Sequence, residues 1–175
     1  MKNRGQVRLN SHHWLELDNN PTLDYFEFFK NSKIVWGEIS DKSKFCFDDE
    51  GYYMEATGFI MSGENLKYLS AYMNSKLAEW YFNLIGTTTG MGTNRWKKYK
   101  IENLPIIIPD KQIEKAFDSH VDALKLRNKN NQDTSDIEQQ IDLMVYKLYE
   151  LTYDEILIVD PDTPIGKKEY KAFKL

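Results

Sequence analysis

One loop of this sequence combines the residue types that read nucleic acid. Residues 86–95 are Gly-Thr-Thr-Thr-Gly-Met-Gly-Thr-Asn-Arg. Glycines let a backbone approach a ligand closely, while arginine can pair with guanine, asparagine with adenine, and threonine methyl groups can contact thymine. The loop is neither a P-loop, because no Gly-Lys-Ser/Thr follows, nor a dinucleotide fingerprint, because it follows a predicted helix. It is a candidate DNA-reading loop, and the alternative is a flexible surface loop.

A basic segment with interleaved aromatic residues follows directly. Residues 95–100 are Arg-Trp-Lys-Lys-Tyr-Lys, so residues 86–100 hold four cations and no acid. Cations beside aromatic side chains are typical of phosphate-contacting surfaces. In the alternative interpretation, this segment is a solvated helix start with Trp96 turned into the core.

The charge of the chain is distributed unevenly. The net charge is −4 at pH 7, but residues 1–109 sum to zero, residues 110–160 to −6 and residues 161–175 to +2. Phosphate attraction acts within a Debye length of roughly 10 Å, so an acidic chain can still bind DNA through one basic face.

Length and composition limit the class of protein. The 175 residues, of which 41% are hydrophobic, fit one domain with a core, or one domain plus a small helical appendage. No apolar run approaches the roughly 20 residues that cross a bilayer, and the first residues are polar. One cysteine allows no intrachain disulfide. We therefore expect a cytoplasmic protein without membrane contact.

Patterns for catalysis or metal binding are weak. His12 and His13 lack a third ligand at a sensible spacing, so we predict no metal site. Asp162, Glu169 and Lys171 are the residue types of a PD-(D/E)xK nuclease, but their spacing is short and no strand pattern holds them. A small Mg²⁺ nuclease is therefore only a third hypothesis. No Ser-His-Asp or Cys-His set stands out, and we expect no catalytic residue in this chain.

The first half of the chain predicts β structure followed by a long helix. Residues 33–36 and 45–47 have strand composition, residues 48–51 read as a hairpin-type turn, and residues 52–61 continue on its far side. Over residues 64–84, apolar side chains recur at spacings of three and four, which predicts one amphipathic helix with a core-facing side. These apolar residues are Leu66, Leu69, Met73, Leu77, Trp80 and Leu84.

The second half predicts a short strand and a pair of helices. Residues 104–109, Leu-Pro-Ile-Ile-Ile-Pro, read as a buried strand closed by prolines. Residues 111–128 and 136–149 predict two helices that form an antiparallel hairpin. Ser135 and Glu138 fit a capping box for the second of these helices.

A short final helix completes the pattern. Thr152 and Glu155 fit another capping box, which predicts a helix that runs to about Val159. Pro161 and Pro164 are expected to end regular structure.

The order of these pieces resembles a known family. The series looks like the TaqI-like C-terminal specificity domain of single-chain restriction–modification enzymes. Its most characteristic part is the helix sequence Asn-Ser-Lys-Leu at residues 74–77. The proline-ended strand that leads through Gln112 into a long helix is similar to the specificity subunits of type I restriction enzymes. The residues that carry the resemblance, over about 12–160, are Lys33-Ile34-Val35, Phe45, Asp48, Tyr52, residues 68–77, the glycine-rich loop, residues 104–109 and residues 141–152.

The resemblance implies a target recognition domain that reads a short duplex sequence from the major groove. Such a domain positions a methyltransferase, and sometimes a nuclease, on the target. The catalytic parts are absent from this sequence, since it has no Asn-Pro-Pro-Tyr motif and no glycine-rich cofactor strand. We therefore expect either a fragment of a larger enzyme or a separate specificity subunit. S-adenosylmethionine and Mg²⁺ would belong to the missing catalytic domains, and this chain would hold no cofactor.

The candidate DNA-binding residues fall into three groups. Residues of the loop are expected to contact bases or nearby phosphates, and the basic segment, with Trp96, is expected to hold backbone phosphates. A third group lies at the head of the β region. The candidates are Thr87, Thr88, Thr89, Asn94, Arg95, Trp96, Lys97, Lys98, Lys100, Lys42, Ser43 and Lys44.

The predicted fold is α+β. Residues 1–109 are expected to form a recognition domain with a mixed β-sheet and packed helices, residues 110–160 an antiparallel helical hairpin, and residues 161–175 a tail. The predicted function is sequence-specific recognition of double-stranded DNA for a methyltransferase or nuclease of the same system. The alternative is a protein–protein docking module that acts through the acidic helical hairpin.

Overall fold

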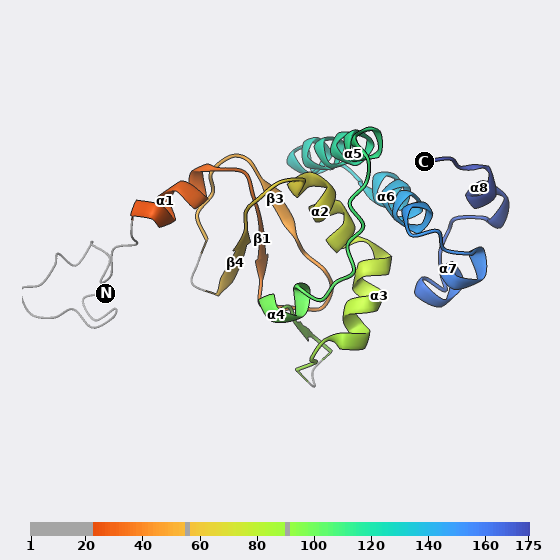
Figure 1. The fold of residues 1–175 in the computed structure, drawn as a ribbon, viewed down its shortest axis with the longest axis horizontal. Helices are drawn as coiled ribbons and strands as arrows, with labels where there is room; N and C mark the ends of the chain where they lie inside the picture. The colour runs from red at the N-terminus through yellow and green to blue at the C-terminus, as the bar shows by residue number, and fades with distance from the viewer. Residues whose placement is uncertain (1–22, 55–56, 90–91) are drawn as a thin grey trace, which may run out of the picture.

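The computed structural model describes residues 23–54, 57–89 and 92–175. Figure 1 shows a small sheet, α2 and α3 beside it, and α5 to α8 beyond these helices. The α+β class is confirmed. In chain order the elements are α1 (Leu23–Lys30), β1 (Lys33–Gly37), β2 (Ile39–Ser40), β3 (Cys46–Asp48), β4 (Gly58–Met61), α2 (Leu66–Asn74), α3 (Lys76–Ile85), β5 (Asn94–Arg95), α4 (Lys98–Ile101), α5 (Lys111–Lys129), α6 (Ser135–Leu148), α7 (Tyr153–Val159) and α8 (Lys167–Ala172).

The main sheet has three strands in the order β3-β1-β4, and a second sheet pairs β2 with β5. All described strand pairs are antiparallel, so the prediction of a mixed sheet is wrong. The central strand β1 buries Ile34 and Trp36. A strand with large apolar residues fits a position that is paired along both edges.

The predicted turn at residues 48–51 is present, but it does not join neighbouring strands. Gly51 has a φ of +81°, which favours glycine, and the Asp48 carboxylate accepts hydrogen bonds from the N–H groups of Glu50 and Tyr52. The same carboxylate pairs with the buried ammonium group of Lys33 on β1. The turn is therefore fixed to the central strand, and the chain crosses to the opposite edge before it forms β4.

Ser75 breaks the predicted long helix into α2 and α3. Its backbone is extended, with φ −71° and ψ 156°, and its hydroxyl donates to the carbonyl of Tyr72 and accepts from the N–H of Ala78. The Asn74 side chain bonds both the N–H and the carbonyl of Phe45. Side chains that replace backbone partners in this way compete with a continuous helix. Beyond the break Leu77 is still buried, but Leu84, the last residue of the predicted apolar face, is 65% exposed.

Residues 105–109 are extended but pair with no strand, so the predicted buried strand is wrong. The prolines at both ends supply no N–H for a ladder. Tyrosine hydroxyls take the place of a partner strand. Tyr68 donates to the carbonyl of Ile107, and Tyr72 and Tyr149 both donate to the carbonyl of Pro105. This segment therefore connects α4 to α5 across α2 (Figure 1).

The two predicted helices α5 and α6 are confirmed, and their connection is short, so they run antiparallel. The predicted capping box of Ser135 and Glu138 is wrong, because Thr134 is the N-cap and the Asp133 carboxylate accepts from the N–H of Ser135. The box of Thr152 and Glu155 is confirmed at the start of α7.

Regular structure continues beyond the prolines that were expected to end it. Helix α8 begins at Lys167, and its Glu169 carboxylate accepts from the N–H of Gly166. Tyr170 of this helix is buried and donates to the carbonyl of Leu151. The tail is therefore packed against the preceding helices.

None of the helices in the described part of the chain has the length and apolar character needed to span a membrane.

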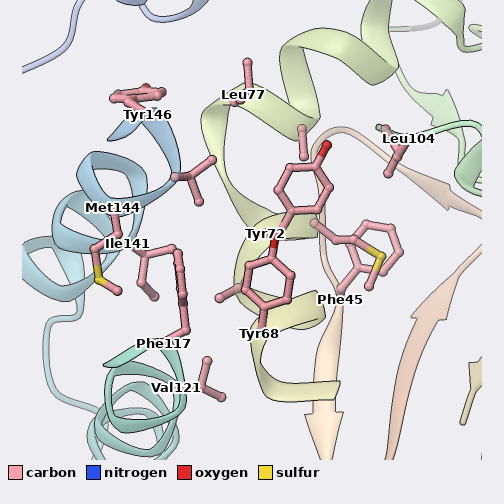
Figure 2. Packing of buried hydrophobic residues seen from close by; sticks show 14 of the residues in the cluster. Phe45, Tyr68, Tyr72, Leu77, Leu104, Phe117, Val121, Ile141, Met144 and Tyr146 are labelled. Carbon is pink, nitrogen blue, oxygen red and sulfur yellow. The ribbon is translucent and has the colours of Figure 1, made fainter. Parts of the chain in front are cut away.

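A single cluster of buried residues joins the sheet side to the helical side. Figure 2 shows Tyr68 and Tyr72 of α2 between Phe45 on one side and Phe117, Ile141 and Met144 on the other. The heptad-like seam of α6 is thus buried inside this chain. The predicted boundary between domains at residue 109 stays a prediction.

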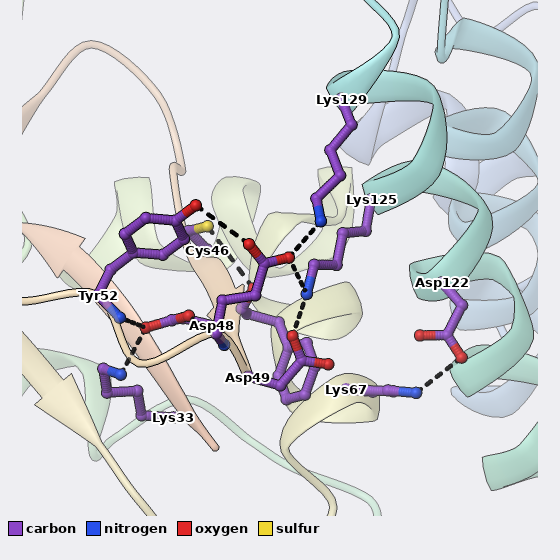
Figure 3. Close-up of polar contacts among 11 residues, drawn as sticks. Lys33, Cys46, Asp48, Asp49, Tyr52, Lys67, Asp122, Lys125 and Lys129 are labelled. Carbon is purple, nitrogen blue, oxygen red and sulfur yellow. Dashed lines mark hydrogen bonds and ion pairs between the residues drawn. The ribbon is translucent and has the colours of Figure 1, made fainter. Parts of the chain in front are cut away.

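Ion pairs also join α5 to the turn after β3. Lys125 pairs with Asp49 and Glu50, and Lys129 pairs with Glu50 (Figure 3). These hydrogen bonds, first from Lys129 and then from Lys125, lower the pKa of Glu50 to about 2. Two lysines of the acidic helical hairpin therefore form ion pairs with the turn after β3.

The carboxyl group of Asp142 makes the stability of the chain depend on pH. Its carboxylate on α6 accepts a hydrogen bond of 2.8 Å from the N–H of Lys76, the first residue of α3. Burial raises the pKa of this carboxyl to about 7. The folded chain then binds more protons than the unfolded chain between about pH 4 and pH 7, so its free energy of unfolding falls as pH rises through that window.

We expect Asp142→Asn to be more stable than the wild type at pH 8, by about 2 kcal/mol, and nearly equal to it at pH 4. The amide oxygen can still accept from the N–H of Lys76, while the partly buried charge is removed. Urea denaturation at both pH values measures the difference. Asp154→Asn is the control, since its side chain is 85% exposed. An equal difference at both pH values would contradict this account.

Candidate nucleic-acid interface

Residues 86–89 lie antiparallel to residues 92–95, with a bridge between Thr88 and Asn94. The N–H of Arg95 donates to the carbonyl of Thr87 at 3.0 Å, and the N–H of Thr89 donates to the carbonyl of Thr93 at 2.9 Å. Gly92 has a φ of +77°, which favours glycine at the turn. We call residues 86–89 and 92–95 the recognition hairpin. Its strand β5 pairs with β2, where Ile39 is opposite Arg95. The loop predicted from the sequence therefore contributes one short strand, β5, and one bridge at Thr88.

Trp96 anchors the recognition hairpin in the core. It is 2% exposed, and its ring stacks on Phe82 of α3 with centroids 3.9 Å apart and an interplanar angle of 15°. Phe45 meets the same ring edge-on at 5.5 Å. The Trp96 N–H donates to the carbonyl of Glu38, and its carbonyl accepts from the indole N–H of Trp36. Trp96 is turned into the core, as in the alternative interpretation, and its side chain positions the hairpin.

The threonines and asparagine of the hairpin divide into exposed and inward residues. Thr87 and Thr88 are exposed. Thr89 is half-buried, and its hydroxyl lies 2.6 Å from that of Thr93. Asn94 is 8% exposed, and its amide donates to the side-chain oxygen of Asn83. Thr87 and Thr88 therefore remain candidates for contact, while Asn94 holds the hairpin to α3.

The cations of the basic segment have different environments. Arg95 pairs with Glu38 at 2.9 Å, and Lys97 lies 3.9 Å from the same carboxylate oxygen. Lys98, at the start of α4, is exposed and lies 3.6 Å from Glu102. Lys100 donates instead to the carbonyl of Ile85, the last residue of α3, at 2.6 Å. A cation at this position stabilises the C-terminal end of a helix, which gives Lys100 a structural role.

The third group of candidates lies next to the hairpin. Residues 41–44 directly follow β2, the strand that pairs with Asn94 and Arg95 of β5. Ser43 is nearly buried, and its N–H and hydroxyl donate to the Glu79 carboxylate. Lys44 pairs with Asp41, while Lys42 is exposed and has no ion pair among the described residues. Of this group, Lys42 and Lys44 are accessible and Ser43 is a positioning residue.

Comparison with protein families adds the observation that decides the class of protein. Residues 4–106, more than half of the chain, match the TaqI-like C-terminal specificity domain. The chain belongs to this family. A search among curated proteins gives no match. The resemblance found in the sequence is confirmed, and the family supports a role in DNA sequence recognition within restriction–modification.

The match places the recognition hairpin inside the specificity domain. The described part of the matched region, residues 4–106, contains both sheets and helices α1 to α4. Helix α5 begins after the matched region. A specificity domain is not itself catalytic. Within the described ranges, no group of three or more His, Cys, Asp or Glu residues could hold a metal ion. His12 and His13 lie outside the described residues.

Glu38 is the residue of this surface that the sequence analysis missed. It follows β1 and lies 57 residues before Arg95 in the chain, yet it contacts Arg95 directly. Residues 86–100 contain no acidic residue, so their charge alone gave no sign that a carboxylate lies beside Arg95. The one available signal was an acid placed at the end of a buried strand, and that signal alone does not identify a partner.

Gly86 has a steric role in the specificity domain. A Cβ atom at this position would lie 2.7 Å from the carbonyl oxygen of Phe82 and 2.9 Å from its ring. That ring stacks on Trp96, so a side chain here would press on the anchor of the hairpin. Glycine at this position serves close packing within the protein.

We expect Gly86→Ala to lower the free energy of unfolding by about 1–3 kcal/mol, because overpacking displaces buried side chains. Gly166→Ala is the matched control. A methyl group there would have no neighbouring atom within 4 Å, and the φ of −74° suits alanine. Urea denaturation with tryptophan fluorescence measures both variants. Equal stabilities for the two variants would show that Phe82 does not hold the hairpin as described.

Proposed function

We propose that this specificity domain binds double-stranded DNA through the recognition hairpin and the adjoining residues 41–44 and 97–98. The observation that carries this proposal is the anchored hairpin, which holds Thr87, Thr88 and Arg95 at the surface beside exposed lysines. Rigid backbone elements position side chains more exactly than mobile loops do, and base reading requires such positioning. The hairpin would read base edges in the major groove, and the lysines would hold phosphates.

In this proposal the chain positions a methyltransferase or a nuclease that it does not contain. The chain itself would carry out no reaction. S-adenosylmethionine and Mg²⁺ would be bound by the catalytic partner. The packed helices α5 and α6 would transmit the position of the hairpin to this partner.

The alternative is a docking function of the acidic helical hairpin. Its apolar seam is unavailable for this purpose, because Ile137, Ile141 and Met144 are at most 7% exposed inside this chain. A partner would have to contact the outer, acidic side of α5 and α6. Salt dependence separates the two functions, since DNA binding through several cations weakens steeply with salt.

We expect Lys98→Ala and Lys42→Ala each to weaken binding of random-sequence duplexes and to reduce the salt slope of log affinity by about 1, without changing sequence preference. The reason is that each lysine would neutralise one phosphate. Fluorescence anisotropy over a salt series measures the slope. Lys168→Ala, an exposed lysine on α8, is the control and should match the wild type.

Two results would contradict the proposal. One is wild-type duplex binding that does not depend on salt. The other is loss of binding in Lys168→Ala equal to that in Lys98→Ala, which would move the DNA surface to the helical side of the molecule.

A further inference from the structure

Arg95 and Glu38 form a pair at the edge of the second sheet. The Arg95 Nη1 donates to the Glu38 Oε1 at 2.9 Å. Their side chains are 42% and 32% exposed, respectively, so both remain accessible to a ligand. Within the described residues, Glu38 is the one ion-pair partner of Arg95. The remaining guanidinium N–H groups and one carboxylate oxygen are therefore left for an outside partner.

The backbones that carry this pair are fixed on several sides. Arg95 lies opposite Ile39 in the β2–β5 pair, and its N–H donates to Thr87. The carbonyl of Glu38 accepts from the N–H of Trp96 at 2.7 Å. Because Trp96 is held in the core, both side chains project from a platform that does not need to reorganise on binding. Preorganisation of this kind reduces the entropy cost of a specific contact.

The pair presents donors directly beside an acceptor. In the major groove, guanine shows two acceptors, N7 and O6, and the cytosine paired with it shows a donor, the N4 amino group. Arginine can bond both guanine acceptors, and a glutamate can accept from cytosine N4. A thymine–adenine pair shows a different order of groups and a methyl group. The Arg95–Glu38 pair is therefore complementary to one G·C base pair.

We propose that Arg95 and Glu38 together read one G·C base pair in the target, with Glu38 as a specificity-determining residue. This inference rests on the proposed DNA-binding function and adds which base pair is read and by which side chains. Glu38 both orients the guanidinium group and accepts from the cytosine. The competing explanation is that Glu38 only neutralises Arg95 and Lys97, which lies 3.9 Å from the same oxygen.

The experiment is selection of bound duplexes from a randomised pool at low salt, followed by affinity measurements on the selected site and on its single base-pair variants. The proteins are the wild type, Glu38→Gln, Arg95→Lys and the control Lys97→Ala. Glu38→Gln keeps the shape of the side chain but removes its charge. Arg95→Lys keeps the charge but removes the forked donors. Thermal unfolding checks that each variant is folded.

The expected result is a wild-type motif with a G·C pair at a fixed position. At that position, the preference for G·C over the other pairs should fall about tenfold in both Glu38→Gln and Arg95→Lys, as for loss of one good base contact. The salt slope of Arg95→Lys should not change. Lys97→Ala should weaken all duplexes by a similar factor and keep the motif.

Other outcomes overturn the inference and can be separated from failure of DNA binding. If Glu38→Gln binds every duplex more tightly and keeps the motif, Glu38 only neutralises charge. If the motif contains no G·C pair whose preference depends on Arg95, the pair reads no base. If the wild type binds no duplex, the proposed function fails, and the inference fails with it.

Discussion

The stacking of Trp96 on Phe82 is the contact on which the recognition surface depends. It joins the strand that ends the hairpin to α3, the helix that begins it. The backbone of the same tryptophan bonds the Glu38 carbonyl and the Trp36 indole, so Trp96 joins the hairpin to the central strand and to the residue before β2. Without this contact, the hairpin would keep its pairing with β2 but lose its side-chain anchor on α3.

The direction of α3 is set one helix earlier. Asn74 and Ser75 end α2 and start α3, and Asn74 also bonds Phe45, which in turn contacts Trp96. The Asn-Ser-Lys-Leu sequence that marks the family resemblance is therefore a structural joint between two helices. Its effect on the proposed DNA reading is indirect: it aims α3 and, through Gly86, the start of the hairpin.

The candidate residues of this surface fall into two groups: those whose side chains bond or pack inside the protein, and those whose side chains are exposed to a ligand. Ser43, Asn94, Trp96 and Lys100 have inward partners in Glu79, Asn83, Phe82 and Ile85, respectively. Thr87, Thr88, Lys42 and Lys98 are exposed beside them. All these residue types occur in DNA-binding surfaces. Only the packing shows which of the side chains remain exposed for contact with DNA.

Much of the fold could be predicted from the sequence, and the failures have physical causes. Helices α5 and α6 follow local apolar spacing and α7 begins at a capping box, so these three helices could be predicted. The break at Ser75 was missed because the apolar spacing continues through it, while the hydrogen bonds that cause it join Asn74 to Phe45, far away in the chain. The strand order was missed because pairing with β1 is non-local. Glu38 was missed for the same reason, since no local pattern joins it to Arg95.

The most direct test of the account is site-specific crosslinking to DNA. A photo-crosslinking p-benzoyl-phenylalanine replaces Thr88 in one sample and Lys168 in another, and each folded protein is irradiated with duplex DNA at low salt. If the anchored hairpin reads DNA, covalent adducts to bases form from position 88 and none form from position 168. Adducts from position 168, or bound DNA without adducts from position 88, would contradict the claim that the anchored hairpin is the DNA-reading element.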